Sequence, residues 1–181
     1  MLVNTPKVSL GWQAAAFDLA DPDGNTFSLA KLNNEKPLVV AFICNHCPYV
    51  VAIANRLAED ARILQDEGIN VVAINANDYK SYPSDSPEKM KLFAAQHNFS
   101  FPYVIDEDQS VARAYDAVCT PDFFGFDRNG ALQYRGRLDN ARMDNDANRT
   151  PELLNAMRQI AKTNTGPAQQ LASMGCSIKW R

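Results

Sequence analysis

The sequence predicts an α/β protein whose sheet contains both parallel and antiparallel strands. Two short apolar runs, at residues 37–43 and 69–75, flank a segment with helical periodicity. A strand–helix–strand unit of this kind has parallel strands. Turn sequences at residues 21–24 and 127–130 predict two β-hairpins, and the strands of a hairpin are antiparallel. A sheet that includes both kinds of unit is mixed.

The N-terminal part of the chain is predicted to form a small hairpin followed by a buried strand. Residues 16–19 and 26–29 flank the turn sequence Asp-Pro-Asp-Gly. The run at residues 37–43 is short and almost continuously apolar. Such a run is typical of a strand that is buried on both faces of a sheet.

A long amphipathic helix is predicted over residues 47–67. Pro48 suits its first turn, where a missing N–H costs nothing, and Gly68 suits a left-handed end. The polar residues Arg56 and Asp60 fall on the side opposite the apolar stripe, so we expect them to face solvent. The stripe recurs at spacings of three and four, and consists of Val50, Ile53, Leu57, Ala61 and Leu64.

Shorter elements are predicted in the second half of the chain. Ser86 is expected to cap a helix, and a strand at residues 103–105 and a short helix at 108–117 follow. The Asn-Gly pair within residues 123–134 is typical of a tight hairpin turn. Thr150 is expected to cap the last helix.

The last residues are predicted to pack back onto the protein. We expect a single domain over residues 1–181, with a core at about 15–163 and a tail at 164–181. The apolar residues of the tail show no helical or strand period, but leaving Trp180 in water would forgo burial energy. We therefore expect Trp180 to be at least half buried, and Gly175 to permit a sharp bend.

Composition and charge exclude several classes of function. The chain is 46% hydrophobic and 22% charged, which excludes general disorder. Its net charge of −3 gives no basic excess for a nucleic-acid partner. No apolar run approaches the roughly 20 residues of a membrane span. The N-terminus lacks a basic segment followed by an apolar stretch, so we expect a cytoplasmic protein.

Cys44 and Cys47 form a Cys-x-x-Cys motif between a predicted buried strand and a helix N-terminus. In this context the spacing is typical of a redox dithiol. The positive end of the helix would lower the pKa of a thiol at Cys44, and an imidazolium at His46 would lower it further. We therefore expect Cys44 to be the more exposed and more acidic thiol, and the nucleophile, with Cys47 resolving the mixed disulfide.

Metal binding and structural packing are the alternatives for this pair. A structural zinc site needs four ligands, and a second Cys-x-x-Cys or a histidine pair is absent from the sequence. We therefore expect neither a metal nor an organic cofactor. Two inert buried cysteines remain possible, as does a buried inert role for Cys119 or Cys176 in place of an auxiliary thiol.

Taken together, these segments resemble the thioredoxin-fold superfamily. The resemblance is to the redoxin branch with the alkyl hydroperoxide reductase and thiol-specific antioxidant domain. It rests on the N-terminal hairpin, the buried strand, the motif Cys-Asn-His-Cys-Pro and the stretch at residues 118–122 before a hairpin. The resemblance implies a three-layer α/β/α thioredoxin-like fold. It also implies that Pro121 is a cis-proline beside the dithiol, with Thr120 presenting its backbone to a substrate strand.

One feature of the thioredoxin pattern is missing. The family's buried carboxylate, which helps to deprotonate the second cysteine, would fall in the strand before the motif. Residues 38–43 contain no acidic residue. The partner for proton transfer at Cys47 is therefore not evident from the sequence.

The function predicted from these features is thiol–disulfide exchange. Its substrate would be a protein or low-molecular-weight thiol or disulfide. A separate electron donor, which the sequence does not identify, would also be needed. A peroxiredoxin-like thiol peroxidase is one alternative, because Cys47 precedes Pro48 and would match the peroxidatic position. A thioredoxin-fold binding module without catalysis is the other. The oligomeric state is left open.

Overall fold

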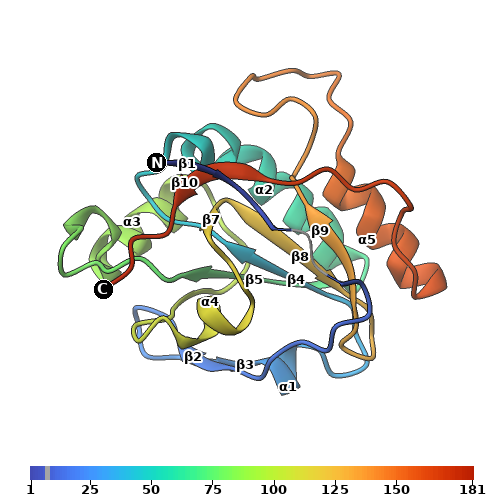
Figure 1. Cartoon of the computed structure of the whole chain (residues 1–181), viewed down its shortest axis with the longest axis horizontal. Helices are drawn as coiled ribbons and strands as arrows, with labels where there is room; N and C mark the ends of the chain where they lie inside the picture. The colour runs from blue at the N-terminus through green and yellow to red at the C-terminus, as the bar shows by residue number, and fades with distance from the viewer. Residues whose placement is uncertain (7–8) are drawn as a thin grey trace.

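The computed structural model describes residues 1–6 and 9–181. Among these, a seven-stranded sheet has the order β3-β2-β6-β5-β4-β8-β9, and a three-stranded sheet has the order β1-β10-β7 (Figure 1). The strands are β1 (Leu2–Asn4), β2 (Asp18–Ala20), β3 (Thr26–Ser28), β4 (Leu38–Phe42), β5 (Asn70–Asn75), β6 (Tyr103–Ile105), β7 (Cys119–Thr120), β8 (Asp122–Phe126), β9 (Leu132–Gly136) and β10 (Met174–Ser177). The helices are α1 (Leu29–Leu32), α2 (Pro48–Asp66), α3 (Pro87–Gln96), α4 (Ser110–Ala114) and α5 (Glu152–Thr163), with a 3-10 turn at Pro83–Asp85.

The larger sheet is mixed, as the sequence predicts. Strand β4 pairs in parallel with β5, and β5 pairs in parallel with β6. Strand β8 pairs antiparallel with β4 and forms a hairpin with β9, while the β2–β3 hairpin extends the other edge. Every residue of β4 is buried, because both faces of the sheet are covered at this strand.

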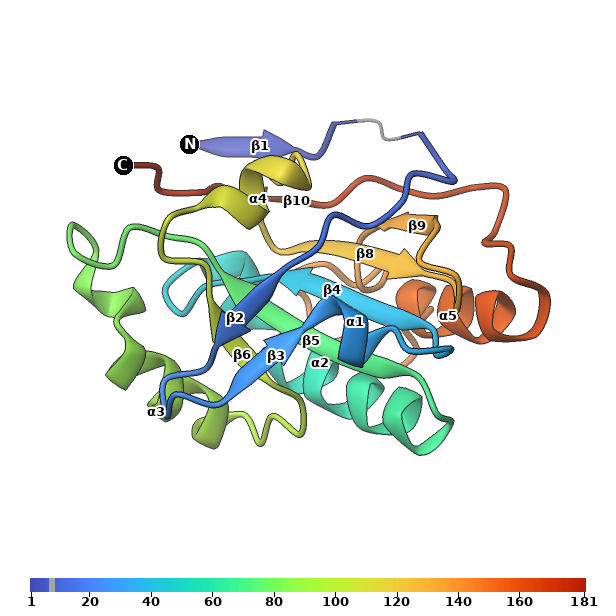
Figure 2. The ribbon, with the colours of Figure 1, turned by 90° about the horizontal axis from the view of Figure 1, so that it is seen from below.

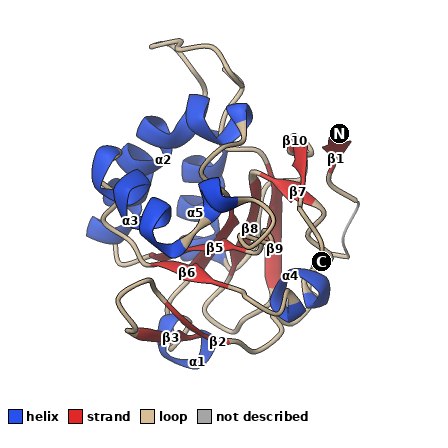
Figure 3. Cartoon of the chain, turned by 90° about the vertical axis from the view of Figure 1, so that its left-hand side faces the viewer, coloured by secondary structure: helices blue, strands red, loops and turns tan. Residues whose placement is uncertain are grey.

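Helices α2, α3 and α5 cover one face of the larger sheet (Figure 3). The other face is covered by α4, by side chains of the N-terminal segment such as Phe17, and by Ile178 of the tail. The architecture is thus the layered thioredoxin-like one, although the second helical layer is short and is completed by non-helical chain. No helix among the described residues is both long and apolar enough to cross a bilayer.

Helix α2 begins at Pro48 as predicted, and Gly68 follows its end with a φ of 82°. The expectation that Arg56 and Asp60 face solvent is wrong, because both are buried. Arg56 pairs with Asp139 at 2.8 Å, and Asp60 pairs with Arg149 at 2.6 Å. Both partners come from the loop between β9 and α5, which folds over this flank of the helix. Helical periodicity alone gives no sign of that loop.

The start of α5 also differs from the prediction. Pro151 is the residue at the helix N-cap, and no side chain caps the helix there. Thr150 lies one residue earlier, where its backbone N–H donates to Asn140 Oδ1 at 2.7 Å. The loop before the helix therefore holds Thr150 away from the capping position.

The C-terminal tail docks onto the protein, as predicted, but it does so as a strand. Strand β10 pairs antiparallel with both β1 and β7, and Figure 2 shows β1 and the tail on the same side of the molecule. Ile178 is buried, and Trp180 is 37% exposed, so it is more than half buried. Gly175 does not make the expected bend. It lies within β10, where a Cβ would meet the carbonyl oxygen of Thr120 at 1.9 Å.

Candidate active site

Cys44 and Cys47 lie where the central strand passes into the long helix. Cys44 follows β4 and Ile43, and Cys47 directly precedes α2 as its N-cap residue. Both are buried, with 1% and 0% exposure. The expectation that Cys44 is the more exposed thiol is therefore not supported, because both sulfurs are covered.

Thr120 and Pro121 lie against the two cysteines. The peptide bond between them is cis, as the resemblance implies. The hydroxyl of Thr120 is 3.3 Å from the sulfur of Cys44, and its carbonyl oxygen is 3.2 Å from the sulfur of Cys47. The structure thus brings Cys44 and Cys47 together with Thr120 and Pro121, which lie more than 70 positions later in the sequence.

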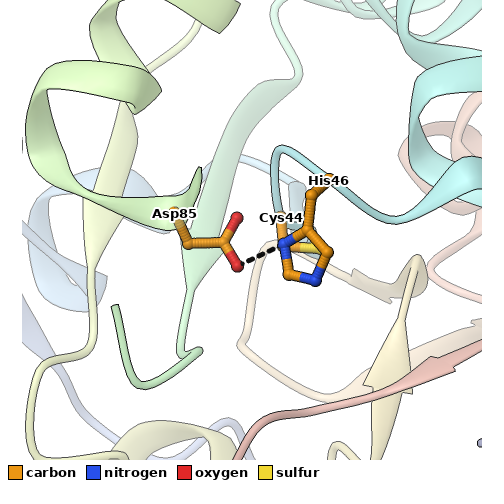
Figure 4. Close-up of side chains that lie close together, drawn as sticks. All are labelled: Cys44, His46 and Asp85. Carbon is orange, nitrogen blue, oxygen red and sulfur yellow. Dashed lines mark ion pairs between the residues drawn. The ribbon is translucent and has the colours of Figure 1, made fainter. Parts of the chain in front are cut away.

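His46 lies between the two cysteines in the sequence and faces a buried acid (Figure 4). Its Nδ1 atom is 2.8 Å from Oδ2 of Asp85, while a third of the His46 side chain remains exposed. A carboxylate at Nδ1 holds the proton of the neutral ring there and leaves Nε2 as the basic nitrogen. The ring of Tyr82 lies parallel to that of His46, with centroids 6.2 Å apart.

Asp85 is a residue of this site that the sequence analysis missed. Its carboxylate is buried and accepts the backbone N–H of Asn45 and the side-chain amide of Asn77, each at 2.8 Å. It therefore ties the loop after β5 to the cysteine motif. One signal could have indicated it: the polar loop at residues 77–85 follows the carboxyl end of a parallel strand, where functional residues collect. The thioredoxin pattern directs attention instead to β4.

Cys44, His46 and Asp85 also form a group that could hold a metal ion. Their ligand atoms lie within 4.8 Å of one another. Sulfur, imidazole and carboxylate ligands together suit zinc. The oxygens of Asp85 are, however, already engaged by three donors. A metal would have to displace the bond between Asp85 and His46, so the arrangement fits a hydrogen-bonded His46–Asp85 pair beside Cys44 better.

The surroundings of the two thiols differ in a way that the motif alone does not indicate. The pKa of Cys47 is lowered to about 5, chiefly by a hydrogen bond from Cys44, with further stabilisation from Cys176 and the backbone N–H of Val50. The pKa of Cys44 is raised, by its interaction with Cys47, by burial and by the charge of Asp85. Cys47 is next to the first turn of α2, whereas Cys44 is next to a buried carboxylate.

Cys119 and Cys176 lie at the edge of the site. Cys119 is wholly buried in β7, and desolvation raises its pKa to about 12, which is what a packed small residue would show. Cys176 is partly exposed in β10, opposite Thr120, and stabilises the thiolate of Cys47. A cavity of about 230 Å³ opens beside Pro121 and is also lined by Tyr49.

Two solved structures resemble this protein along nearly its whole length. One is an uncharacterized conserved protein from Geobacillus kaustophilus, with 42% identity and a TM-score of 0.93, covering 100% of this chain and 97% of the other. The second is a hypothetical protein from Sinorhizobium meliloti, with 40% identity and a TM-score of 0.91, covering 98% of each chain. They confirm the fold without indicating a reaction.

Curated relatives carry names from redox chemistry. Thiol-disulfide oxidoreductase YkuV from Bacillus subtilis is 28% identical over 107 residues, which covers 58% of this chain and 68% of the relative. A protein from Mycobacterium tuberculosis, provisionally named a peroxiredoxin, is 26% identical over 132 residues, covering 73% of this chain and 79% of the relative. The model of the AhpC/TSA family matches residues 10–135, which is more than half of the sequence. The chain therefore belongs to the AhpC/TSA family.

Proposed function

We propose that Cys44 and Cys47 are the redox-active dithiol through which this thiol–disulfide oxidoreductase exchanges electrons with its substrates. The observation that carries the proposal is the convergence of both sulfurs on Thr120, beside a cis-proline and an oriented histidine. The relatives named thiol-disulfide oxidoreductases support the same class of reaction.

We propose an order of events in which Cys47, the residue at the N-cap of α2, reacts first. Where a substrate disulfide gains access to the buried dithiol, the thiolate of Cys47 attacks one of its sulfurs, and the other substrate sulfur leaves as a thiolate. Cys44 then loses its proton and attacks the sulfur of Cys47 in the mixed disulfide. The second substrate thiolate leaves, and a Cys44–Cys47 disulfide remains. Two electrons pass from the dithiol to the substrate, and the exchange is reversible.

His46 is placed to handle the proton of Cys44 in the second step. A ring nitrogen of His46 and the sulfur of Cys44 belong to the group whose atoms lie within 4.8 Å of one another. Asp85 fixes the orientation of the ring, and the partly exposed side chain gives the proton a route to solvent. The dithiol thus has a buried carboxylate nearby, but this one lies in the loop after β5 and acts on Cys44 rather than on Cys47.

The substrate is proposed to be a protein or small-molecule thiol or disulfide. Thr120 and Pro121 would border the site that it occupies, and the cavity beside Pro121 could receive a side chain next to the reacting cysteine. Exchange between sulfur atoms requires no further bound group. An electron donor of the same chemistry, another dithiol, would return the enzyme to its starting state.

Turnover of a protein disulfide tests the proposal. The full chain is incubated with dithiothreitol and insulin, and precipitation of reduced insulin is followed by turbidity. We expect Cys44→Ser and Cys47→Ser each to abolish catalysis, and Cys119→Ser to retain it. Catalysis that survives loss of both motif cysteines would contradict the proposal. The same holds for a wild-type rate equal to the uncatalysed rate, which would favour a non-catalytic binding module.

A thiol peroxidase is a second candidate, because Cys47 is the acidic thiol and directly precedes α2. Peroxide would oxidise the Cys47 thiolate to a sulfenic acid and be reduced to water or an alcohol. A neighbouring thiol would then condense with the sulfenic acid, releasing water and forming a disulfide. The relative named a peroxiredoxin supports this candidate.

Peroxide consumption separates the two candidates. Wild type and Cys44→Ser are compared for hydrogen peroxide removal in the presence of dithiothreitol. A peroxidase with Cys47 as the peroxidatic residue forms a sulfenic acid in the double variant Cys44→Ser/Cys176→Ser, which lacks both neighbouring thiols that could consume it, and dimedone labelling of the peptide detects it. If peroxide leaves Cys47 unlabelled while insulin is reduced by wild type, the thiol–disulfide exchange proposal stands alone.

A further inference from the structure

The dithiol is covered by the chain's own C-terminal strand. Strand β10 pairs antiparallel with β7, so that Cys176 lies opposite Thr120. This is the backbone edge that the resemblance assigns to a substrate strand. With β10 in place, neither Cys44 nor Cys47 is more than 1% exposed. An external disulfide therefore cannot reach either sulfur unless the tail moves or a third thiol acts between them.

The covering strand brings such a thiol to the site. Cys176 pairs with Thr120, whose carbonyl oxygen is 3.2 Å from the sulfur of Cys47, and it packs against the core cluster that contains the dithiol. Its thiol and backbone N–H also lower the pKa of Cys47. Its neighbour Gly175 fixes this register. A Cβ there would meet the carbonyl oxygen of Thr120 at 1.9 Å and the ring of Pro121 at 3.0 Å. Only glycine allows the strand to come so close.

The tail is held in this position by contacts of the residues that follow β10. The backbone N–H of Ile178 donates to the carbonyl of Val118 at 2.9 Å. The backbone N–H of Lys179 donates to Asn77, whose amide in turn donates to Asp85. Beyond Lys179, the guanidinium of Arg113 lies 4.4 Å from the ring centroid of Trp180. These contacts fix the tail, and they therefore hold Cys176 beside Cys47 in the folded protein.

Exposure distinguishes Cys176 from the other cysteines. Cys44, Cys47 and Cys119 are buried, whereas Cys176 is partly exposed. It is therefore the cysteine that is in contact both with the thiolate of the dithiol and with solvent.

We propose that Cys176 is a third redox-active thiol, which exchanges disulfides with Cys47 and connects the buried dithiol to external substrates. The inference rests on the proposed function of Cys44 and Cys47. In the step concerned, the Cys176 thiolate attacks the sulfur of Cys47 in the Cys44–Cys47 disulfide. The Cys44–Cys47 bond breaks, a Cys47–Cys176 bond forms, and Cys44 leaves as a thiolate that takes up the proton lost by Cys176. No external oxidant is consumed.

The Cys47–Cys176 disulfide then reacts with the substrate at its partly exposed sulfur, that of Cys176. A substrate thiolate attacks the sulfur of Cys176, and the Cys47 thiolate leaves. A second substrate thiolate releases Cys176, so that the substrate is oxidised and the three cysteines are reduced. Run in the opposite direction, the same steps reduce a substrate disulfide. In either direction the tail remains docked.

Cross-linking in the full-length protein tests the inference, because trypsin separates the cysteines. Cys44 and Cys47 fall in peptide 32–56, Cys119 in 114–128, and Cys176 in 163–179. The variant Cys44→Ser lacks the thiol with which Cys47 is proposed to form its disulfide in wild type. Oxidation of this variant with diamide, followed by alkylation, digestion and mass spectrometry, is expected to give peptide 32–56 joined to 163–179.

Two further variants serve as matched controls. Adding Cys119→Ser to Cys44→Ser should leave the cross-link unchanged, and adding Cys176→Ser should abolish it. A free Cys47 thiol in oxidised Cys44→Ser, or a cross-link to peptide 114–128 instead, would overturn the inference. Far-ultraviolet circular dichroism of each variant shows whether the fold is retained.

Exchange kinetics separate this inference from the proposed function. The single variant Cys176→Ser still contains Cys44 and Cys47, so it should form their disulfide in diamide. Its exchange with oxidised glutathione should be at least about tenfold slower than in wild type. An unchanged rate would overturn the role of Cys176 and leave the proposed function intact. Failure of wild type to form any Cys44–Cys47 disulfide would instead contradict the proposed function.

Discussion

Oδ2 of Asp85 lies 2.8 Å from Nδ1 of His46, and joins the loop after β5 to the motif that carries the dithiol. The other carboxylate oxygen accepts the backbone N–H of Asn45 at 2.8 Å. The acid is buried, whereas the histidine is partly exposed. Asp85 therefore acts on the cysteines in two ways: it orients His46, and its charge opposes a thiolate at Cys44.

Replacing Asp85 by Asn should separate these two effects. Loss of the negative charge should lower the pKa of Cys44, because that charge is one of the causes that raise it. Asp85→Asn should also leave His46 less well oriented and slow insulin reduction about tenfold. Removing a residue that orients a functional side chain typically costs about tenfold or more in activity. The pKa is measured from the pH dependence of the cysteine Cβ resonance by NMR.

Two controls accompany the Asp85 variant. Asp23→Asn, at an exposed ion pair with Lys91, should change neither quantity. Asp85→Glu, which keeps the charge, should keep the pKa of Cys44 closer to the wild-type value than Asp85→Asn does. A Cys44 titration that is the same in wild type and Asp85→Asn would show that the carboxylate does not act on the dithiol.

His46→Gln should make the dithiol more reducing. His46 donates its Nδ1–H to Asp85, so its loss leaves the charge of Asp85 less compensated and a thiolate at Cys44 less stable. We expect a change of tens of millivolts, where about 30 mV corresponds to tenfold in the equilibrium constant. Equilibration in glutathione buffers measures the potential. When His46→Gln is introduced into Asp85→Asn instead of wild type, the shift in potential should largely vanish. Equal shifts in wild type and in Asp85→Asn would show that His46 does not act through Asp85.

The acidity of Cys47 predicts how the stability of the reduced protein depends on pH. Its pKa in the folded state, about 5, lies below the ordinary thiol value of 9.0. Between these values the unfolded state binds more protons, so the stabilisation grows as pH rises and is lost as pH falls towards 5. The slope should not exceed about 1.4 kcal/mol per pH unit.

Urea unfolding under reducing conditions, from pH 5 to 9, tests this dependence. The quantity to compare is the difference between wild type and Cys47→Ser, because other groups also titrate. Burial raises the pKa of Asp122 to about 7, for example, and so gives the opposite slope below that pH. A difference that stays constant across the range would show that Cys47 is not an acidic thiol.

Gly175→Ala should displace the C-terminal strand. The added Cβ would overlap the carbonyl oxygen of Thr120, so β10 cannot keep its pairing with β7. We expect a loss of about 1–3 kcal/mol in stability, as for other overpacked sites. The motif cysteines should also be alkylated faster in the folded state. Ser177→Ala, in the same strand but without such an overlap, is the control and should change neither property.

The elements of the fold could be predicted from local signals, whereas the contacts between distant segments could not. The apolar run of β4 and the stripe of α2 are properties of short windows, and both predictions are confirmed. The burial of Arg56 depends on Asp139, 83 residues away, which no periodicity reveals. The tail has no strand period of its own because β10 is defined by its neighbours β1 and β7.

The candidate site follows the same rule. The cysteine motif and Pro121 are recognisable from sequence, the first by spacing and the second by resemblance. Asp85 is not, because it lies in a polar loop and reaches the motif only through the packing of that loop. The different surroundings of the two thiols are hidden for the same reason, since Asp85 and Cys176 act on the two thiols in opposite directions.

The central claim is that Cys44 and Cys47 form a redox-active disulfide, and thiol mapping in redox buffers tests it most directly. The full chain is equilibrated at graded ratios of reduced to oxidised glutathione, quenched with acid, alkylated and digested with trypsin. We predict a single two-electron transition in which both cysteines of peptide 32–56 become protected together, while Cys119 remains a free thiol throughout. If Cys44 and Cys47 can be alkylated at every ratio, the claim is contradicted.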